Sequence, residues 1–350
     1  MPTLHINLRK IEQNTRLVTG LLKPHGVRLV GVTKACQGNE LVAEAMLAGG
    51  AAALADARPT SVDNLRRFFP GAALELMRPV AGMKKLSAAA DIYFVSTQTQ
   101  ATAIMRLCPP RPVRFCLMVD TGDGREGVPL PLVRKEAGRI ASLDGAELVG
   151  LVTNAACARP AAPLAEAVAA FARAAAVAGG QLAGTGGPSS SGRPLLSAGG
   201  SGLLALLLDD AGGRGASGSE AGATPLGPVN ELRCGEAILL GRVPSGNGGR
   251  FLPGAHRDAF VIEAPVLEAF EKEGGMRVLI GLGVQDVGLS RMIPAQAGIY
   301  VGKITSDYLI VHCQGTEKES LGTGAAVCFI PTYYSLLAAM ASPFIEKRFS

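Results

Sequence analysis

Short apolar segments alternate with longer amphipathic segments through the first two thirds of the chain, and this alternation restricts the possible folds most strongly. The amphipathic stretches, such as Glu40–Ala48 and Leu164–Ala178, have the period of an α-helix. Buried parallel strands read as continuous apolar runs, and their alternation with helices is typical of a parallel sheet. Eight apolar segments between the helical ones are strand candidates: Val27–Thr33, Ala51–Ala55, Ala73–Arg78, Asp91–Ser96, Val113–Asp120, Glu147–Thr153, Gln181–Gly184 and Val229–Leu232.

Eight such repeats predict a (β/α)8 TIM barrel over about residues 9–235. An open, doubly wound α/β sheet is the competing architecture. It is disfavoured because no GxGxxG motif follows the first strand and no P-loop occurs in the chain.

The pattern changes after residue 235, where short strands are separated by Gly, Pro and Asp turns. We therefore expect two domains, a barrel at 1–235 and a smaller, mostly-β domain at 236–350. The N-terminal strand candidate at residues 3–7 can pair with this β domain. The strand candidates of the second domain are Ile238–Leu240, Ala259–Ile262, Met276–Ile280, Gly298–Lys303, Tyr308–His312 and Ala325–Phe329.

Composition excludes several classes of protein. The 34 basic and 29 acidic residues are dispersed, so no nucleic-acid partner is expected. No apolar stretch reaches the roughly 18 residues that a membrane helix needs, and the N-terminus lacks the apolar core of a signal peptide. Seven cysteines without CxxC spacing and four scattered histidines predict free thiols, no metal site and a cytoplasmic location.

Polar residues follow most of the predicted strands, and the active site of a (β/α)8 barrel lies at these carboxyl ends of the strands. Asp56 and Arg78 are equally well explained as ordinary loop residues. The polar residues and segments at the predicted mouth are Lys34, Asp56, Arg58, Arg78, Asp120, Gly122, Gly124, Arg125, Asn154, Gly184–Ser191 and Arg233.

Lys34 directly follows the buried strand at residues 29–33. Partial desolvation there would disfavour the ammonium form, as a Schiff-base lysine requires, whereas on position alone the side chain could equally extend to solvent. The glycine-rich segment Gly184–Ser191 favours the first interpretation, because its backbone N–H groups and the hydroxyls of Ser189 and Ser190 suit a phosphate. An amine facing a phosphate cradle fits pyridoxal 5'-phosphate.

With these residues, the chain resembles the fold-type III pyridoxal-phosphate enzymes of the alanine racemase class, and within it the ornithine racemase group. The resemblance implies a barrel, a C-terminal β domain and a head-to-tail homodimer with active sites at the interface. The segments that carry it, over nearly the whole chain, are GVTKACQG, LADAR, MVDTGDGREG, VTNAAC, GTGGPSSS, VNELRCGEAILLG, IGLGVQDV, TSDYL and PTYYSLLAAMAS.

The resemblance also implies roles for individual residues. Lys34 would form the Schiff base and act as one acid/base, and Arg233 would donate to the pyridine nitrogen, which then stays unprotonated. Arg125 would reach the phenolic oxygen of the cofactor, and Asn154 would line its ring. The residues that would hold the phosphate are Gly187, Ser189, Ser190, Gly235, Glu236 and Tyr333.

The chain also departs from the family pattern. Met118 stands where alanine racemases have a carbamylated lysine, and Pro188 replaces an asparagine of the ornithine racemase group. The tyrosine that serves alanine racemases as the second base has no visible counterpart in the segment at residues 262–275. Racemisation needs an acid/base on each face of Cα.

The expected acid/base for the other face comes from the β domain of a neighbouring subunit. Asp286 is the first candidate, with Asp307 and Tyr308 as alternatives, although Asp286 and Asp307 can also be simple turn residues. Ser306 and Asp307 are the expected substrate-binding residues.

Three functions are consistent with these residues. The first is racemisation of a free, ornithine-like or alanine-like amino acid. The second is another pyridoxal-phosphate reaction, such as decarboxylation, aldol cleavage or elimination. The third is a cofactor carrier without turnover, which residues 236–350 argue against because such carriers resemble the barrel alone.

Overall fold

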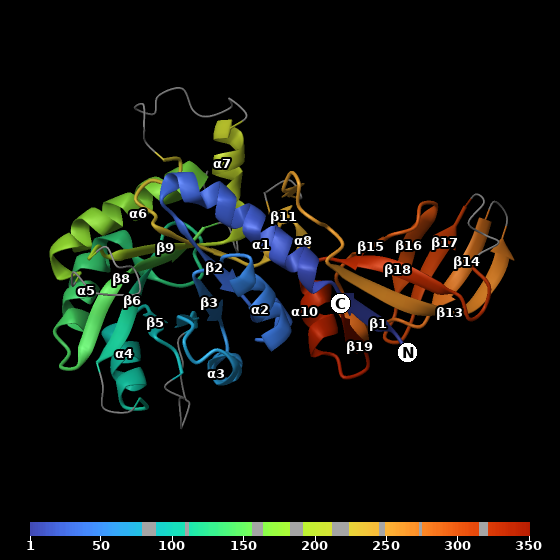
Figure 1. The fold of residues 1–350 in the computed structure, drawn as a ribbon, viewed down its shortest axis with the longest axis horizontal. Helices are drawn as coiled ribbons and strands as arrows, with labels where there is room; N and C mark the ends of the chain where they lie inside the picture. Colours follow the sequence, from blue (N-terminus) through green and yellow to red (C-terminus); the bar gives the residue numbers. More distant parts are fainter. Residues whose placement is uncertain are drawn as a thin grey trace.

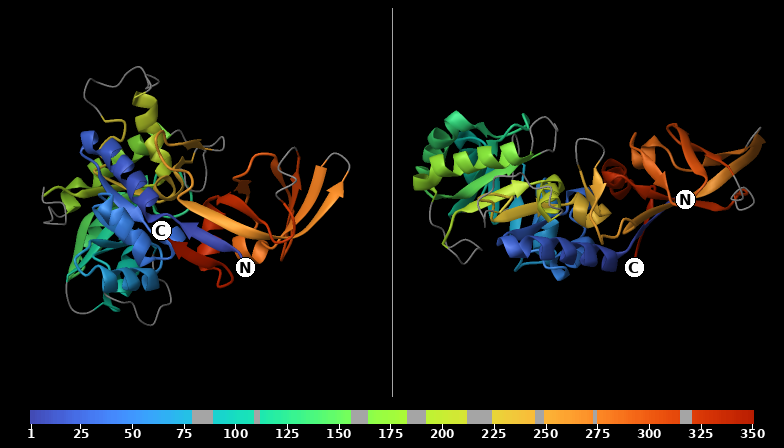
Figure 2. Two further views of the ribbon diagram at one scale, coloured as in Figure 1. Left: turned by 45° about the vertical axis from the view of Figure 1, so that its right-hand side comes forward. Right: turned by 90° about the horizontal axis from the view of Figure 1, so that it is seen from above.

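The computed structural model describes residues 1–78, 89–108, 112–155, 164–182, 192–211, 224–244, 249–272, 275–314 and 321–350. Two lobes follow each other along the molecule, an α/β barrel and an antiparallel β domain (Figure 1). Seen from above, they lie side by side, and both chain termini lie near their junction (Figure 2).

Eight parallel strands close the barrel, because the first strand pairs with the last and the fourth pairs with the fifth. The predicted fold class is confirmed. A two-residue strand, β7 (Val128–Pro129), adds to the barrel sheet beside the fifth strand. The barrel strands are β2 (Arg28–Val32), β3 (Ala53–Asp56), β4 (Leu74–Leu76), β5 (Ile92–Val95), β6 (Val113–Asp120), β8 (Ala146–Asn154), β9 (Leu195–Gly199) and β10 (Glu231–Cys234).

The helices of this lobe pack their apolar faces on the outside of the barrel (Figure 1). In α1, for example, Ile11, Val18 and Leu22 are buried, and Asn7 caps its first turn by accepting from the N–H of Lys10. The helices are α1 (Leu8–Leu22), α2 (Glu40–Ala48), α3 (Pro59–Phe68), α4 (Gln98–Met105), α5 (Val133–Ala141), α6 (Leu164–Ala178), α7 (Leu204–Ala211) and α8 (Glu236–Leu240).

The prediction of the seventh strand at Gln181–Gly184 is wrong. Gln181 ends a 3-10 turn (Gly179–Gln181), and residues 183–184 lie outside the described residues. The seventh strand is β9, which pairs with β8 and β10. The strand is hard to recognise in the sequence, since short apolar runs carry little periodic signal. The eighth strand begins two residues later than predicted, at Glu231.

The second lobe is an antiparallel sheet in which β1 (Thr3–Ile6) pairs with β13 and, in parallel, with β19. The segment Ile238–Leu240, predicted as a strand, belongs instead to helix α8, which continues the barrel chain from β10. The remaining strands and helices are β11 (Arg242–Val243), β12 (Arg250–Phe251), β13 (Phe260–Lys272), β14 (Gly275–Ile280), α9 (Val284–Val287), β15 (Met292–Pro294), β16 (Ile299–Ile304), β17 (Leu309–Cys313), β18 (Ala326–Pro331), α10 (Tyr333–Ala341) and β19 (Glu346–Phe349).

Helix α10 links the lobes, because it packs against the 3-10 turn Lys34–Cys36 that follows β2. The β domain thereby brings Tyr333, the first residue of α10, to the mouth of the barrel. Within the described residues, no helix is both long enough and apolar enough to span a bilayer.

Candidate active site

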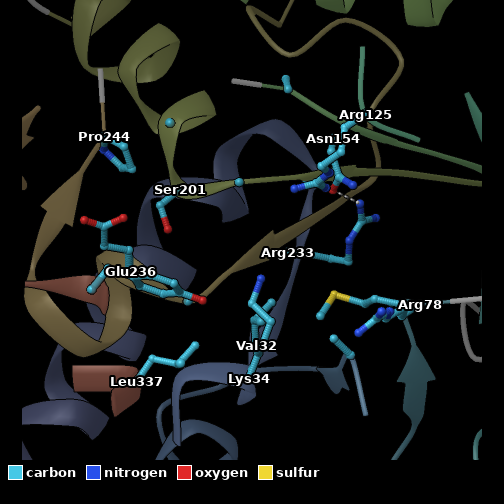
Figure 3. A pocket seen from close by; sticks show the side chains of 18 of the residues that line it. Val32, Lys34, Arg78, Arg125, Asn154, Ser201, Arg233, Glu236, Pro244 and Leu337 are labelled. Carbon is cyan, nitrogen blue, oxygen red and sulfur yellow. Dashed lines mark hydrogen bonds between the residues drawn. The ribbon is translucent and has the colours of Figure 1, made fainter. Parts of the chain in front are cut away.

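A cavity of about 720 Å³ opens at the carboxyl ends of the barrel strands. Figure 3 shows the Lys34 amine pointing into it, with Ser201 and Glu236 on one side and Arg233 and Arg78 on the other. Among the described residues, its lining has five bases, Lys34, Arg78, Arg125, Arg233 and Arg242, and two acids, Glu126 and Glu236. This surplus of positive charge suits an anionic ligand.

Lys34 begins the 3-10 turn Lys34–Cys36, and Gln37, which follows the turn, has a φ of 55° in the left-handed region. The residue before it, Thr33, is held by Asp56 at the end of β3, because its hydroxyl donates to the carboxylate at 2.7 Å. Burial raises the pKa of Asp56, and the bond from Thr33 opposes that rise. The half-buried Lys34 places Nζ 5.9 Å from the centroid of the Tyr333 ring. Asp56 therefore supports the lysine turn and does not line the cavity.

Arg233 lies on β10 with only 2% of its surface exposed. Its guanidinium donates to the Ser197 hydroxyl, to the Thr153 carbonyl at 2.7 Å and to Asn154 Oδ1 at 3.2 Å. It also lies 4.8 Å from the centroid of the Phe94 ring. These contacts fix the guanidinium on the floor of the cavity.

Glu126 joins the other polar groups on this side of the cavity. It accepts from Arg125 Nη2 and from Asn154 Nδ2, each at 2.8 Å. Because Asn154 also accepts from Arg233, the two arginines are connected through one carboxylate and one amide. Glu126 was not predicted as a site residue from the sequence, where the only indication of a role is its position next to Arg125.

The turn after β9 forms the opposite end of the cavity. Gly200 has a φ of 110°, and the Ser201 hydroxyl accepts from the N–H of Ala237 at the start of α8. A Cβ on Gly199 would lie 2.2 Å from Asn154 Oδ1 and 2.6 Å from Arg233 Nη2. A side chain at this position would therefore displace the Asn154 and Arg233 groups.

The sequence signal for this turn is the run SAGGSG at residues 197–202, which spans the end of β9 and the turn after it. The predicted phosphate ligands Gly187, Ser189 and Ser190 lie outside the described residues, in a segment that precedes β9. Gly235, Glu236 and Tyr333 do line the cavity.

Glu236 contributes its side chain to the cavity wall as well as its backbone. Burial raises the pKa of its carboxyl, and the Arg242 guanidinium, 3.8 Å away, opposes that rise. Arg242 was also missed in the sequence, where it is an unremarkable residue after a glycine.

The acid/base and substrate-binding candidates of the β domain do not line the cavity of their own chain, whereas Tyr333 does. Asp286 accepts from the N–H of Gly283 at 2.9 Å and so caps the short helix α9. Asp307 accepts from Gln285 Nε2 at 2.5 Å, and Tyr308 is exposed. Ser306 lies on the same tip, where its carbonyl would be 2.1 Å from a Cβ on Gly283.

The lining residues fit pyridoxal 5'-phosphate. The Lys34 amine can bond its aldehyde carbon, the Arg233 guanidinium can face its ring nitrogen, and the glycine turn at Gly200–Gly202 leaves room for its phosphate beside Ser201. In the described part of the chain, no cluster of His, Cys, Asp or Glu is arranged to hold a metal ion.

A lysine-bearing cavity of this kind, on a (β/α)8 barrel joined to an antiparallel β domain, defines the fold-type III class of pyridoxal-phosphate enzymes. The model of the family "Alanine racemase, N-terminal domain" matches residues 6–189, more than half of the chain. The chain belongs to this family, so the predicted family, enzyme class and cofactor are confirmed.

Curated relatives match over the full length. The chain is 30% identical to the lysine racemase of Thermotoga maritima, over 99% of this chain and 98% of that protein. It is 22% identical to the ornithine racemase of Acetoanaerobium sticklandii, over 99% of each chain.

Solved structures with under 20% identity share the fold. Alanine racemase from Corynebacterium glutamicum matches with a TM-score of 0.73 and 19% identity, over 100% of this chain and 99% of that one. D-threonine aldolase from Filomicrobium marinum matches with a TM-score of 0.72 and 17% identity, over 100% and 91%. Alanine racemase from Bartonella henselae, with covalently bound pyridoxal phosphate, matches with a TM-score of 0.68 and 17% identity, over 100% and 99%. This fold therefore serves both racemases and an aldolase.

Proposed function

We propose that this protein racemises a free amino acid with a basic side chain, such as lysine or ornithine, using pyridoxal 5'-phosphate. The observation that carries the proposal is that the Lys34 amine shares one cavity with the buried guanidinium of Arg233. The names of the two curated relatives support the substrate class.

The bound cofactor supplies an electron sink for the negative charge that forms at Cα of the substrate. Lys34 holds the cofactor and moves a proton at Cα on one face. Arg233 donates to the ring nitrogen and, because a guanidinium stays protonated, keeps that nitrogen unprotonated. Arg125, held by Glu126, binds the phenolic oxygen, and Asn154 lines the ring. Gly235, Glu236, Tyr333 and Ser201 surround the phosphate, with Gly187, Ser189 and Ser190 as further candidates.

On the second face of Cα, the acid/base comes from the β domain of a partner subunit in a homodimer. Asp286 is the proposed second acid/base, and Ser306 and Asp307 bind the substrate; an aspartate at this tip suits an ammonium group. The support is that one chain places these residues outside its own cavity, while large apolar side chains such as Leu289, Ile293 and Tyr300 remain exposed on the same lobe. Tyr308 is the alternative base.

The test is incubation with L-lysine, L-ornithine and L-alanine in deuterated water, followed by chiral chromatography and mass spectrometry. We expect the D-enantiomers of lysine and ornithine, with deuterium at Cα. An aldehyde or carbon dioxide as product would indicate a lyase, aldolase or decarboxylase instead. Bound cofactor without any exchange at Cα would indicate a carrier.

The role of Lys34 is tested separately. Borohydride should fix a pyridoxyl group on the peptide that contains Lys34. A Lys34→Ala protein that still acquires a borohydride-fixed pyridoxyl group elsewhere in the cavity would overturn the assignment.

A further inference from the structure

Two glutamates lie inside the barrel, beneath the floor of the cavity. Glu75 on β4 is 1% exposed and Glu231 on β10 is fully buried. Barrel interiors are usually filled with branched apolar side chains. Because successive residues of a strand face opposite sides, Glu231 lies on the same inner face as Arg233, two residues further along β10.

Glu231 has a counter-ion on the neighbouring strand. Arg28 on β2 is its register partner and donates from Nε and Nη2 to one carboxylate oxygen, at 2.6 and 2.5 Å. The other oxygen of Glu231 and both oxygens of Glu75 are buried without a hydrogen-bond donor among the described residues. Leaving a buried polar atom unpaired costs about 1–3 kcal/mol, and more for a charged group.

A proton between the two glutamates would pair these oxygens, because the carboxyl groups lie within hydrogen-bonding reach of each other. Two adjacent carboxylates in a dry interior cannot both remain ionised. Burial, followed by repulsion from Glu231, raises the pKa of Glu75 well above its ordinary value, while Arg233 and Arg28 oppose the rise.

A cysteine also lies in this part of the interior. Burial, followed by the two carboxyl groups, raises the pKa of the Cys116 thiol on β6 well above its ordinary value, against smaller opposing effects of Arg233 and Arg114. Among the described residues, the guanidinium groups of Arg28, Arg114 and Arg233 are the positive charges that act on these carboxyl and thiol groups.

We propose that Glu75 and Glu231 share a single proton and that Glu75, as a neutral acid, is a positioning residue for Arg233. An ionised Glu75 would draw the Arg233 guanidinium into the barrel, away from Ser197, Thr153 and Asn154. The neutral acid leaves the full charge of Arg233 directed at the cavity. This inference rests on the proposed function in that Arg233 faces the ring nitrogen of the cofactor.

The shared proton is tested by infrared spectroscopy of the full-length protein, with ¹³C in its glutamate carboxyl groups. At neutral pH we expect the carbonyl band of a protonated carboxylic acid. Glu75→Gln should abolish this band, and Cys116→Ser, a change in the same interior, should keep it. A wild-type spectrum without the band would overturn the proposal.

The link to Arg233 is tested by the ¹⁵N signal of ring-labelled pyridoxal phosphate in the loaded protein. Glu75→Gln should leave the signal at the wild-type, unprotonated position. Glu231→Gln should shift it, because Glu75 then ionises beside Arg233, and the double variant Glu75→Gln/Glu231→Gln should restore it. General structural damage would not be repaired by a second substitution.

An unshifted signal in Glu231→Gln, or no restoration in the double variant, would refute the positioning role. Should the cofactor fail to attach to Lys34, the proposed function fails, while the infrared band still reports on the glutamate pair. If Glu231→Gln does not fold, the comparison of the wild type with Glu75→Gln by infrared still decides whether the proton is present.

Discussion

At the scale of single residues, Glu126 is the connection between the two arginines of the cavity. Its carboxylate accepts from both Arg125 and Asn154, and Asn154 accepts from Arg233. A hydrogen bond to a charged group contributes about 1.5–3 kcal/mol. Glu126→Leu should therefore weaken binding of pyridoxal phosphate on the order of 10- to 100-fold, measured by absorbance titration.

Glu126→Gln, which keeps the shape and loses the charge, should fall between Glu126→Leu and the wild type. Glu346→Leu removes an exposed glutamate–arginine pair on β19 and is the matched control, expected to bind the cofactor normally. If Glu126→Leu binds the cofactor with unchanged affinity, the Glu126 carboxylate does not contribute to cofactor binding.

At the scale of elements, the turn after β9 starts from Gly199, the last residue of the strand, which lies close to two polar side chains of the cavity. A Cβ at Gly199 would overlap the Asn154 and Arg233 side chains, at 2.2 and 2.6 Å. We expect Gly199→Ala to separate that pair and to reduce cofactor affinity by at least tenfold, on the order of 1.4 kcal/mol. The same absorbance titration measures it.

Gly179 supplies the control for that element. No atom lies within 4 Å of a Cβ built there, and it begins the 3-10 turn after α6, away from the cavity lining. Gly179→Ala should bind the cofactor like the wild type. Equal behaviour of the two alanine variants would show that the turn after β9 tolerates a side chain.

At the scale of the whole molecule, the glutamate pair makes stability depend on pH. Burial and the neighbouring Glu231 raise the pKa of Glu75, so the folded chain holds a proton that the unfolded chain releases above the ordinary glutamate value of 4.5. The stabilisation from that proton is complete below this value and is lost as the pH rises towards the folded pKa. Relative to Glu75→Gln, the wild type should lose about 1.4 kcal/mol of unfolding free energy per pH unit in this window.

Urea unfolding of both proteins at several pH values measures this difference. A constant gap between the wild type and Glu75→Gln above pH 4.5 would mean that Glu75 is ionised in the fold. Cys116→Ser, which alters the same interior without a carboxyl group, should follow the wild type.

The proposed homodimer makes a second prediction at this scale. Lys34→Ala and Asp286→Asn should each be inactive alone, because each lacks one acid/base of a shared site. If the two are unfolded together and refolded, half of the dimers are mixed and each has one intact site, so about a quarter of wild-type racemase activity should return. If a verified mixed dimer recovers no activity, then either both residues of a site come from the same chain or Asp286 is not an acid/base of the reaction.

The sequence alone predicted those features of the protein that have a strong local cause. The barrel follows from the alternation of buried strands with amphipathic helices, and Lys34 and Arg233 follow from polar residues standing where apolar strands should continue or end. The resemblance to a family added roles to these positions. These features can be predicted from the sequence because each depends on a few neighbouring residues.

The tertiary structure decided what depends on distant segments. The phosphate cradle expected at Gly184–Ser191 lies outside the described residues, whereas pairing with β8 and β10 identifies β9 as the seventh strand and places Gly199–Gly202 in the cavity lining. The bonds of Glu126 to Asn154, and of Glu231 to Arg28, join residues 28 and 203 positions apart. No local pattern encodes such contacts. Closing of the barrel brings its first and last strands together and so forms the bond between Glu231 and Arg28, whereas the pairing of β6 with β8 brings the segment after β6 to Asn154.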